Sequence, residues 1–258
     1  EGGTIGLLEN GTWVSEIPGG SPIWFYQGSD QPYSAFYLPP GNYTMHIDGR
    51  EEGSYDWGCF IGDRAAYSLI GVEGDEETED TVEIQVKDDN PYAGIITFST
   101  SDERKSYSST QIKKFGERER VYKIINASIF SDSIAVINTT DDFNGIMIYN
   151  NGPHKFTFDV EFQGNVLDQA IWEEVNGTLT DLPKALKRGI TIKPYQTLII
   201  RPSTWLDLMH AEVEVIEVTP GEDVDDDHDY VLWAILGITV ILVVAAVAWT
   251  VIRKRRKA

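Results

Sequence analysis

Apolar and polar residues alternate strictly in the segment FTFDVEF at 156–162. Successive side chains of a β-strand point to opposite faces of a sheet, so a period of two is typical of a half-buried antiparallel strand. Shorter apolar runs of the same kind recur along the chain. The pattern predicts further strands at 43–48, 81–87, 95–99, 134–137, 192–200 and 212–218.

Turn-forming residues separate these runs, for example Pro-Pro-Gly-Asn at 39–42 and Asp-Gly at 48–49. The sequence Asn-Asn-Gly at 150–152 is expected to close a hairpin between IMIY and the strand at 156–162. Before residue 220, the segments 181–188 and 111–120 alone are predicted to be helical, and both are short. A fold that alternates strands and helices is therefore not expected.

Many short strands with regular turns predict a mainly β protein made of one or two β-sandwiches, immunoglobulin-like or jelly-roll-like. IWFYQG, YTMHIDG and TVEIQV in the first half are echoed by IMIYNNG, FTFDVEFQG and TLIIRP in the second. This echo predicts two tandem sandwich domains, at 1–88 and 89–220. Two alternatives stay open, namely chance similarity among strands and one larger two-sheet domain.

A run of 23 residues without charge occupies positions 230–252. As a helix with a rise of about 1.5 Å per residue, it spans a hydrocarbon core of about 30 Å. The run ends at Ile252. Tyr230 and Trp233 lie at one end and Trp249 at the other, and aromatic rings favour the headgroup zone. The basic tail at 253–258 is cytoplasmic by the positive-inside rule. We therefore predict a single-pass protein of the cell membrane, anchored in the lipid bilayer by one C-terminal transmembrane helix, with its N-terminus outside.

Charge separates the predicted ectodomain from its tail. The protein has a net charge of −20, and the residues outside the tail carry 16 basic and 41 acidic side chains, a net charge of −25. Such a surface repels phosphates, so nucleic acid binding is not expected. The acidic segment 221–229 is predicted to be a solvated stalk that holds the ectodomain off the bilayer.

The single cysteine and the first residue of the sequence give information on the origin of the protein. Cys59 is the one cysteine, so an internal disulfide is impossible, and we expect this thiol to be buried. Large ectodomains without disulfides are typical of prokaryotes. The sequence starts at Glu1, which agrees with a mature protein whose signal peptide has been removed.

N-glycosylation sequons are more frequent than expected. Half of the ten asparagines begin an N-x-S/T sequon, whereas the Ser and Thr content predicts about one by chance. Together with the lack of disulfides, this excess favours a glycosylated protein of an archaeal envelope. The predicted acceptors are Asn10, Asn42, Asn126, Asn138 and Asn176.

Motifs of common enzyme classes are absent from the sequence. It contains no nucleophile elbow, HExxH, phosphate loop or CxxC pair, and its four histidines lack metal-ligand spacing. No cofactor is expected. Weak Ca²⁺ binding is the alternative, at Asp225, Asp227 and Asp229 or near Asp141 and Asp142, but the first set lacks the glycine and distal Glu of a calcium loop.

Aromatic residues are concentrated near the N-terminus, where Trp24, Phe25 and Tyr26 are followed by Tyr33, Phe36 and Tyr37. A sandwich core accounts for most of them. Trp24, Phe25 and Tyr26 are also the candidates for a partner interface or carbohydrate site, because aromatic side chains are enriched in interfaces.

The segment PPGNYTMHIDGREEGSYDWGCF at 39–60 resembles strands of β-sandwich modules found in archaeal and bacterial extracellular proteins. These strands share the pattern G-x-Y-T-h-x-h-x-G-x-x-x-G-x-Y, where h is apolar. The resemblance covers about 22 residues. It implies an extracellular β module and no particular site.

The sequence predicts a non-enzymatic cell-surface glycoprotein with a protein partner or self-association. It acts either as an envelope structural component or as the extracellular accessory subunit of a membrane complex. The rival hypothesis is a membrane-tethered hydrolase or carbohydrate-binding protein. Converging carboxylates with shifted pKa values would favour the enzyme, and an apolar surface would favour the contact protein.

Overall fold

The computed structural model describes residues 5–7, 13–25, 33–48, 52–61, 65–85, 95–115, 118–140, 142–164 and 183–218. Two compact units divide the chain, Glu1–Val218 and Thr219–Ala258, and every described residue belongs to the first. The described part is mainly β, as predicted. Its strands are β1 Ile5–Leu7, β2 Trp13–Ser15, β3 Ser21–Phe25, β4 Tyr33–Leu38, β5 Asn42–Asp48, β6 Gly53–Ile61, β7 Ala65–Gly74, β8 Glu79–Gln85, β9 Ile95–Thr100, β10 Arg104–Phe115, β11 Arg118–Phe130, β12 Ala135–Thr139, β13 Ile146–Asn150, β14 Phe156–Gly164, β15 Lys184–Ile192, β16 Thr197–Pro202 and β17 Val213–Val218.

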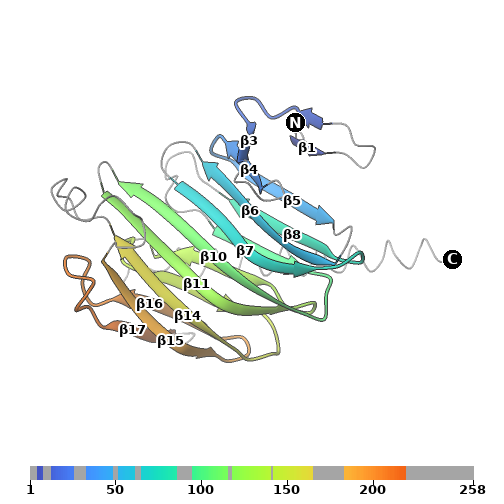
Figure 1. Ribbon diagram of the computed structural model, residues 1–258. Coiled ribbons are helices and arrows are strands. Elements are labelled where there is room, and N and C mark those ends of the chain that lie inside the picture. Colours follow the sequence, from blue (N-terminus) through green and yellow to red (C-terminus); the bar gives the residue numbers. More distant parts are fainter. Residues whose placement is uncertain are drawn as a thin grey trace. The chain divides into compact units, whose positions relative to one another are not determined.

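Two large sheets contain most of these strands, and β1 pairs with β2 separately. The first sheet has the order β15-β14-β11-β10-β7-β6-β4-β3, and the second has the order β17-β16-β13-β12-β9-β8-β5. From β6 onward the chain adds two strands to one sheet and then two to the other (Figure 1). Strands therefore follow chain order across each sheet, which differs from the Greek-key order of immunoglobulin-like and jelly-roll sandwiches.

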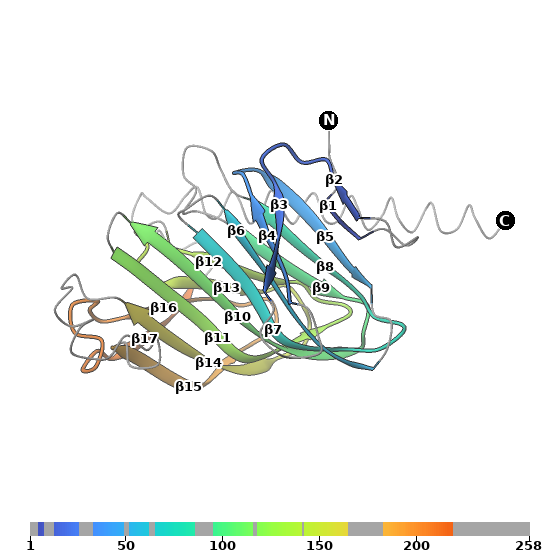
Figure 2. The ribbon, with the colours of Figure 1, turned by 45° about the horizontal axis from the view of Figure 1, so that its top comes forward.

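One hydrophobic core joins the two sheets. Its buried members come from both, such as Leu69 and Phe162 in the first sheet and Ile96 and Leu198 in the second. The view in Figure 2 shows β12 and β13 in the layer behind β10 and β11. The expectation of packed β-sheets is therefore confirmed, because alternate residues of most strands are apolar and fill the space between the layers.

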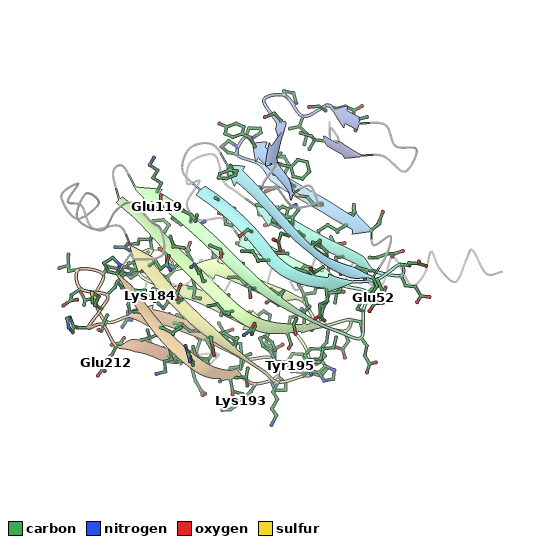
Figure 3. All side chains as sticks on the ribbon, in the orientation of Figure 1. Glu52, Glu119, Lys184, Lys193, Tyr195 and Glu212 are labelled. Atoms are coloured by element: carbon green, nitrogen blue, oxygen red, sulfur yellow. The ribbon has the colours of Figure 1, made fainter. Side chains whose placement is uncertain are left out.

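From β7 onward, the short links between the sheets lie at one end of the strands, which we call the crossover end, whereas the link 39–41 between β4 and β5 lies at the other end. The links at the crossover end from β7 onward are 75–78, 101–103, 131–134, 151–155 and 193–196. Strands of the same sheet are joined at the opposite end, the hairpin end, for example through 203–212. Figure 3 shows Glu52, Lys193 and Tyr195 near the crossover end and Glu119, Lys184 and Glu212 near the hairpin end.

A β-bulge recurs in three hairpins of the first sheet, β6–β7, β10–β11 and β14–β15. In each, the second strand has a residue with positive φ, whose N–H donates to a side chain on the first strand. Because the three bulges are equivalent, the four-strand units β6–β9, β10–β13 and β14–β17 form a structural repeat. The bonds are Gly71 N to Asp56 Oδ1 (2.7 Å), Asn126 N to Ser108 Oγ (3.2 Å) and Gly189 N to Asp159 Oδ1 (2.8 Å).

Both helix predictions are wrong in the described residues. The segment 111–120 covers the end of β10 and the start of β11, and 184–188 begins β15. Lys, Leu and Ala favour helices by intrinsic propensity, but pairing with a neighbouring strand overrides this weak preference. Ala185, for example, is buried in the core opposite Phe162 of β14.

Two connections also differ from the prediction. Residues 150–152 do not close a hairpin, because β13 belongs to the second sheet and β14 to the first. The single strand expected at 192–200 is interrupted at 193–196, where the chain crosses between sheets. Asn, Gly and Pro indicate a change of direction without showing which sheet the chain enters next.

Strand pairing also bears on the predicted domain boundary at residue 88. The pairs β8–β9 and β7–β10 join strands from both sides of that boundary. Both sheets are therefore continuous across it, as in one larger two-sheet domain. The echoed segments IWFYQG and IMIYNNG fall on β3 of the first sheet and β13 of the second, which are not equivalent positions.

The predicted stalk at 221–229, the anchor at 230–252 and the tail at 253–258 lie outside the described residues. Within the described ranges, no helix has the length and apolar character needed to cross a bilayer.

Candidate contact site at the hairpin end

Trp205 anchors the loop between β16 and β17, residues 203–212. Its ring makes edge-on contacts with Tyr122 and Phe162, at centroid distances of 5.5 and 5.8 Å. The Arg120 guanidinium lies 4.5 Å from the centre of the indole, and the indole Nε1–H donates to the Asn144 carbonyl at 2.9 Å. A cation over an aromatic face and a satisfied N–H both favour one fixed ring position.

The base and interior of the loop are also held in place. Ser203 N–H donates to the Glu212 carbonyl at 2.7 Å, and Glu212 N–H donates to Ser203 Oγ at 3.1 Å. Leu208 is buried in the core. His210 Nδ1 and Asp207 Oδ2 are 2.8 Å apart across the turn. The loop therefore has a defined conformation.

Two large apolar side chains project from this loop into solvent. Leu206 is 92% exposed and Met209 is 73% exposed. Isolated exposed apolar residues are common on protein surfaces. These two, however, flank buried Leu208 and follow the anchored Trp205, so an ordered loop presents them together. Such an arrangement is typical of a contact surface, because little conformational entropy is lost on binding.

A buried charged cluster occupies the crossover end. Lys105 Nζ lies 2.8 Å from Asp80 Oδ2 and 3.0 Å from Asp102 Oδ2, and Tyr55 donates a hydrogen bond to Asp80. Burial, followed by the bond to Asp80, raises the pKa of Tyr55. Lys105 and Asp80 are almost fully buried, so substrate cannot reach the cluster in this conformation. The cluster joins the two sheets, since Lys105 is on β10 and Asp80 on β8.

A second lysine, Lys113, is buried on the same face of β10 near the hairpin end. Its Nζ donates a hydrogen bond to Tyr67 Oη and lies 4.1 Å from the centre of the Tyr67 ring. Burial lowers the pKa of Lys113 to about 7. Burial also raises the pKa of the adjacent Cys59 thiol, so the predicted burial of Cys59 is confirmed and the thiol is inert at neutral pH.

The structure describes only two of the three residues of the predicted aromatic interface. Trp24 and Phe25 lie on β3 opposite Ser34 and Tyr33 of β4, and Tyr26 lies outside the described residues. On the same edge of the first sheet, Tyr37 and Phe60 are paired on neighbouring strands and are 39% and 38% exposed. The interface prediction for Trp24, Phe25 and Tyr26 stays a prediction.

The sequon asparagines have different surroundings. Asn42 at the start of β5 and Asn126 at the bulge of β11 are exposed. Asn138 on β12 is buried, and its Oδ1 has no hydrogen-bond partner among the described residues. Asn10 and Asn176 lie outside the described ranges.

No group of three or more His, Cys, Asp or Glu in the described residues can hold a metal ion. Asp142 accepts bonds from Thr140 Oγ1 and the Asn144 N–H inside its own turn. Burial would raise the pKa of Asp142, but these bonds and the charge of Arg201 outweigh burial and lower it. The other candidate calcium ligands, Asp141, Asp225, Asp227 and Asp229, lie outside the described residues.

Searches against protein-family models, curated proteins and solved structures found no match.

Sequence reasoning missed the contact loop. The segment TWLDLMH at 204–210 contains Trp205, Leu206, Leu208 and Met209, and its spacing does not separate buried from exposed positions. Leu208 becomes buried and Trp205 partly buried because Tyr122 of β11 and Phe162 of β14 lie below the loop. This arrangement depends on strand order, which periodicity does not reveal.

Proposed function

We propose that this protein is a non-enzymatic cell-surface glycoprotein that acts by contact with a protein partner through its hairpin end. Its role is that of an archaeal envelope component or of the extracellular accessory subunit of a membrane complex. One observation carries the proposal: Leu206 and Met209 are exposed on a loop that Trp205 and Leu208 hold rigid.

The direction of the chain supports this assignment. β17 runs from Val213 at the hairpin end to Val218 at the crossover end, and residues 219–258 follow. The chain therefore leaves the described part at the crossover end, whereas Leu206 and Met209 lie at the hairpin end. Tethering raises the local concentration of two membrane proteins, so even a modest interface holds a complex together.

Site-specific photo-crosslinking in native membranes tests this proposal. A photoreactive residue replaces Leu206 in one variant and Tyr195 in another, because Tyr195 is 63% exposed at the opposite end. We expect one discrete crosslinked product from position 206 and none from position 195. Equal labelling at both positions, or none at 206, would contradict a contact site at the hairpin end.

A further inference from the structure

The inward face of β10 is polar where a β-sandwich is normally apolar. Ser109, Gln111 and Lys113 occupy alternate positions on this face, and each is at most 1% exposed. At the positions equivalent to Ser109 and Gln111 in the repeat, β14 carries Val160 and Phe162. Burial of polar groups is unfavourable unless they form hydrogen bonds, so the three residues require partners inside the protein.

Several buried polar atoms on this face of β10 and on strand β6 of the same sheet have no hydrogen-bond partner in the part of the chain that the structure describes. They are Ser109 Oγ, both amide atoms of Gln111 and the indole Nε1 of Trp57. Trp57 and Ser109 both pair with Leu69 from opposite sides, so they lie in one row across the sheet, about 10 Å apart at the backbone. Leaving such a group unpaired costs about 1 to 3 kcal/mol.

Charge indicates what would satisfy these atoms. Lys105, eight residues earlier on the same face, forms ion pairs with Asp80 and Asp102, whereas Lys113 has no carboxylate partner among the described residues. The titratable or charged groups that face Lys113 are Tyr67 on β7, Cys59 on β6 and Arg120, which pairs with Lys113 from β11. Burial keeps the Cys59 thiol neutral and Arg120 is cationic, so these two groups add no negative charge to this part of the core.

From these observations we infer that the inward face of β10 binds a small monovalent anion, with the Lys113 ammonium as counter-charge and Trp57 Nε1, Ser109 and Gln111 as hydrogen-bond donors. Trp57 Nε1–H can only donate, and the lysine ammonium offers three donors. An acceptor with negative charge therefore fits better than a cation. Lys113 lies two residues before Phe115, where β10 ends near the hairpin end.

Proton linkage gives the inference a specific signature. Burial lowers the pKa of Lys113 to about 7, so at pH 8 the free protein holds mostly neutral lysine. A bound anion favours the charged form and raises this pKa. Binding at pH 8 is therefore accompanied by uptake of close to one proton, and binding at pH 6 by almost none.

Isothermal titration calorimetry on the full-length protein in detergent tests the inference. Sodium formate and sodium chloride are the probes, with sodium sulfate keeping the ionic strength constant. Comparing buffers of different ionisation enthalpy gives the number of protons taken up. We expect saturable binding of formate or chloride with about one proton taken up per anion at pH 8. Binding of formate alone assigns a carboxylate, and binding of chloride alone assigns a halide.

Matched variants separate this site from general salt effects. Lys113→Met should weaken anion binding at least about tenfold, because a hydrogen bond to a charged group contributes about 1.5 to 3 kcal/mol. Exposed Lys114→Met should bind like the wild type. Gln111→Leu serves as a second test if Lys113→Met does not fold. Absence of saturable binding, or equal binding by all variants, would overturn the inference.

Discussion

The two ends of the sandwich use similar residues in different ways. At the crossover end, short links of three to five residues close over a buried lysine that has two carboxylate partners. At the hairpin end, the buried lysine has a tyrosine partner instead, and the 203–212 loop exposes Leu206 and Met209. The difference is what we expect if the crossover end stabilises the fold and the hairpin end has the proposed role in recognition.

The largest expected effect is at the crossover end. Asp80→Ala leaves Lys105 buried beside the partly exposed Asp102 alone and removes the acceptor of Tyr55. Breaking a buried pair typically costs about 3 to 5 kcal/mol, and we expect a loss of that order in the free energy of unfolding. Urea denaturation followed by circular dichroism measures it.

Asp132→Ala is the matched control, because Asp132 pairs with exposed His154 at the same end. Exposed pairs contribute at most about 1 kcal/mol. Similar losses for Asp80→Ala and Asp132→Ala would show that the buried cluster does not hold the sheets together.

Lys113 predicts a pH dependence of stability at the hairpin end. Its pKa falls from 10.5 in the unfolded chain to about 7 in the fold, so the unfolded state binds more protons between these values and stability rises with pH. At 1.36 kcal/mol per unit, and with the native lysine already half deprotonated at pH 7, the gain from pH 7 to 9 is about 2 kcal/mol. Below pH 7, titration of Lys113 causes little further change in the free energy of unfolding.

Unfolding measured at pH 7, 8 and 9 without small anions checks this prediction. Lys113→Met should abolish most of the rise, and Lys114→Met should retain it. An identical pH profile for wild type and Lys113→Met would mean that Lys113 is not titrating in the fold.

Trp205 and Leu206 are neighbours with opposite expected effects. Trp205→Ala removes the ring contacts to Tyr122 and Phe162 and should cost about 2 to 3 kcal/mol, less than a fully buried tryptophan. Leu206→Ala should change the unfolding free energy by less than about 0.5 kcal/mol, because the side chain is 92% exposed. A comparable loss for both variants in urea denaturation would contradict the division into anchor and contact residues.

Sequon use should follow exposure. We expect glycans on Asn42 and Asn126 and none on Asn138, which is buried on β12. Glycopeptide mass spectrometry of the protein from its native membrane reads each site separately. Full occupancy of Asn138, or bare peptide at both Asn42 and Asn126, would contradict this expectation.

Individual strands show how much of the fold could be predicted from the sequence. β14 was predicted correctly because its alternation places Phe158, Val160 and Phe162 in the core. β15 was predicted to be helical because KALKR has high helix propensity, and the pairing with β14 that overrides it is not visible locally. The link after β13 shows the same limit, since Asn-Asn-Gly suits a hairpin as well as a crossing between sheets.

The candidate site was less predictable than the fold. Leu206 and Met209 differ from Leu208 only by their place in the folded loop, and composition does not distinguish them. Lys113 was hidden for a related reason, because lysine on a strand is normally exposed. Its burial follows from the inward register of β10, in which it pairs with Ala65.

One measurement tests the central assignment of recognition to the hairpin end. We compare the double variant Leu206→Asp/Met209→Asp with a control, Tyr195→Asp at the crossover end. Both proteins are purified in mild detergent from native membranes, and the amount of partner recovered per molecule is quantified. We expect the double variant to lose at least about 90% of the partner while unfolding at the wild-type urea midpoint, and Tyr195→Asp to retain it. Full recovery with the double variant, or equal loss with Tyr195→Asp, would contradict the account.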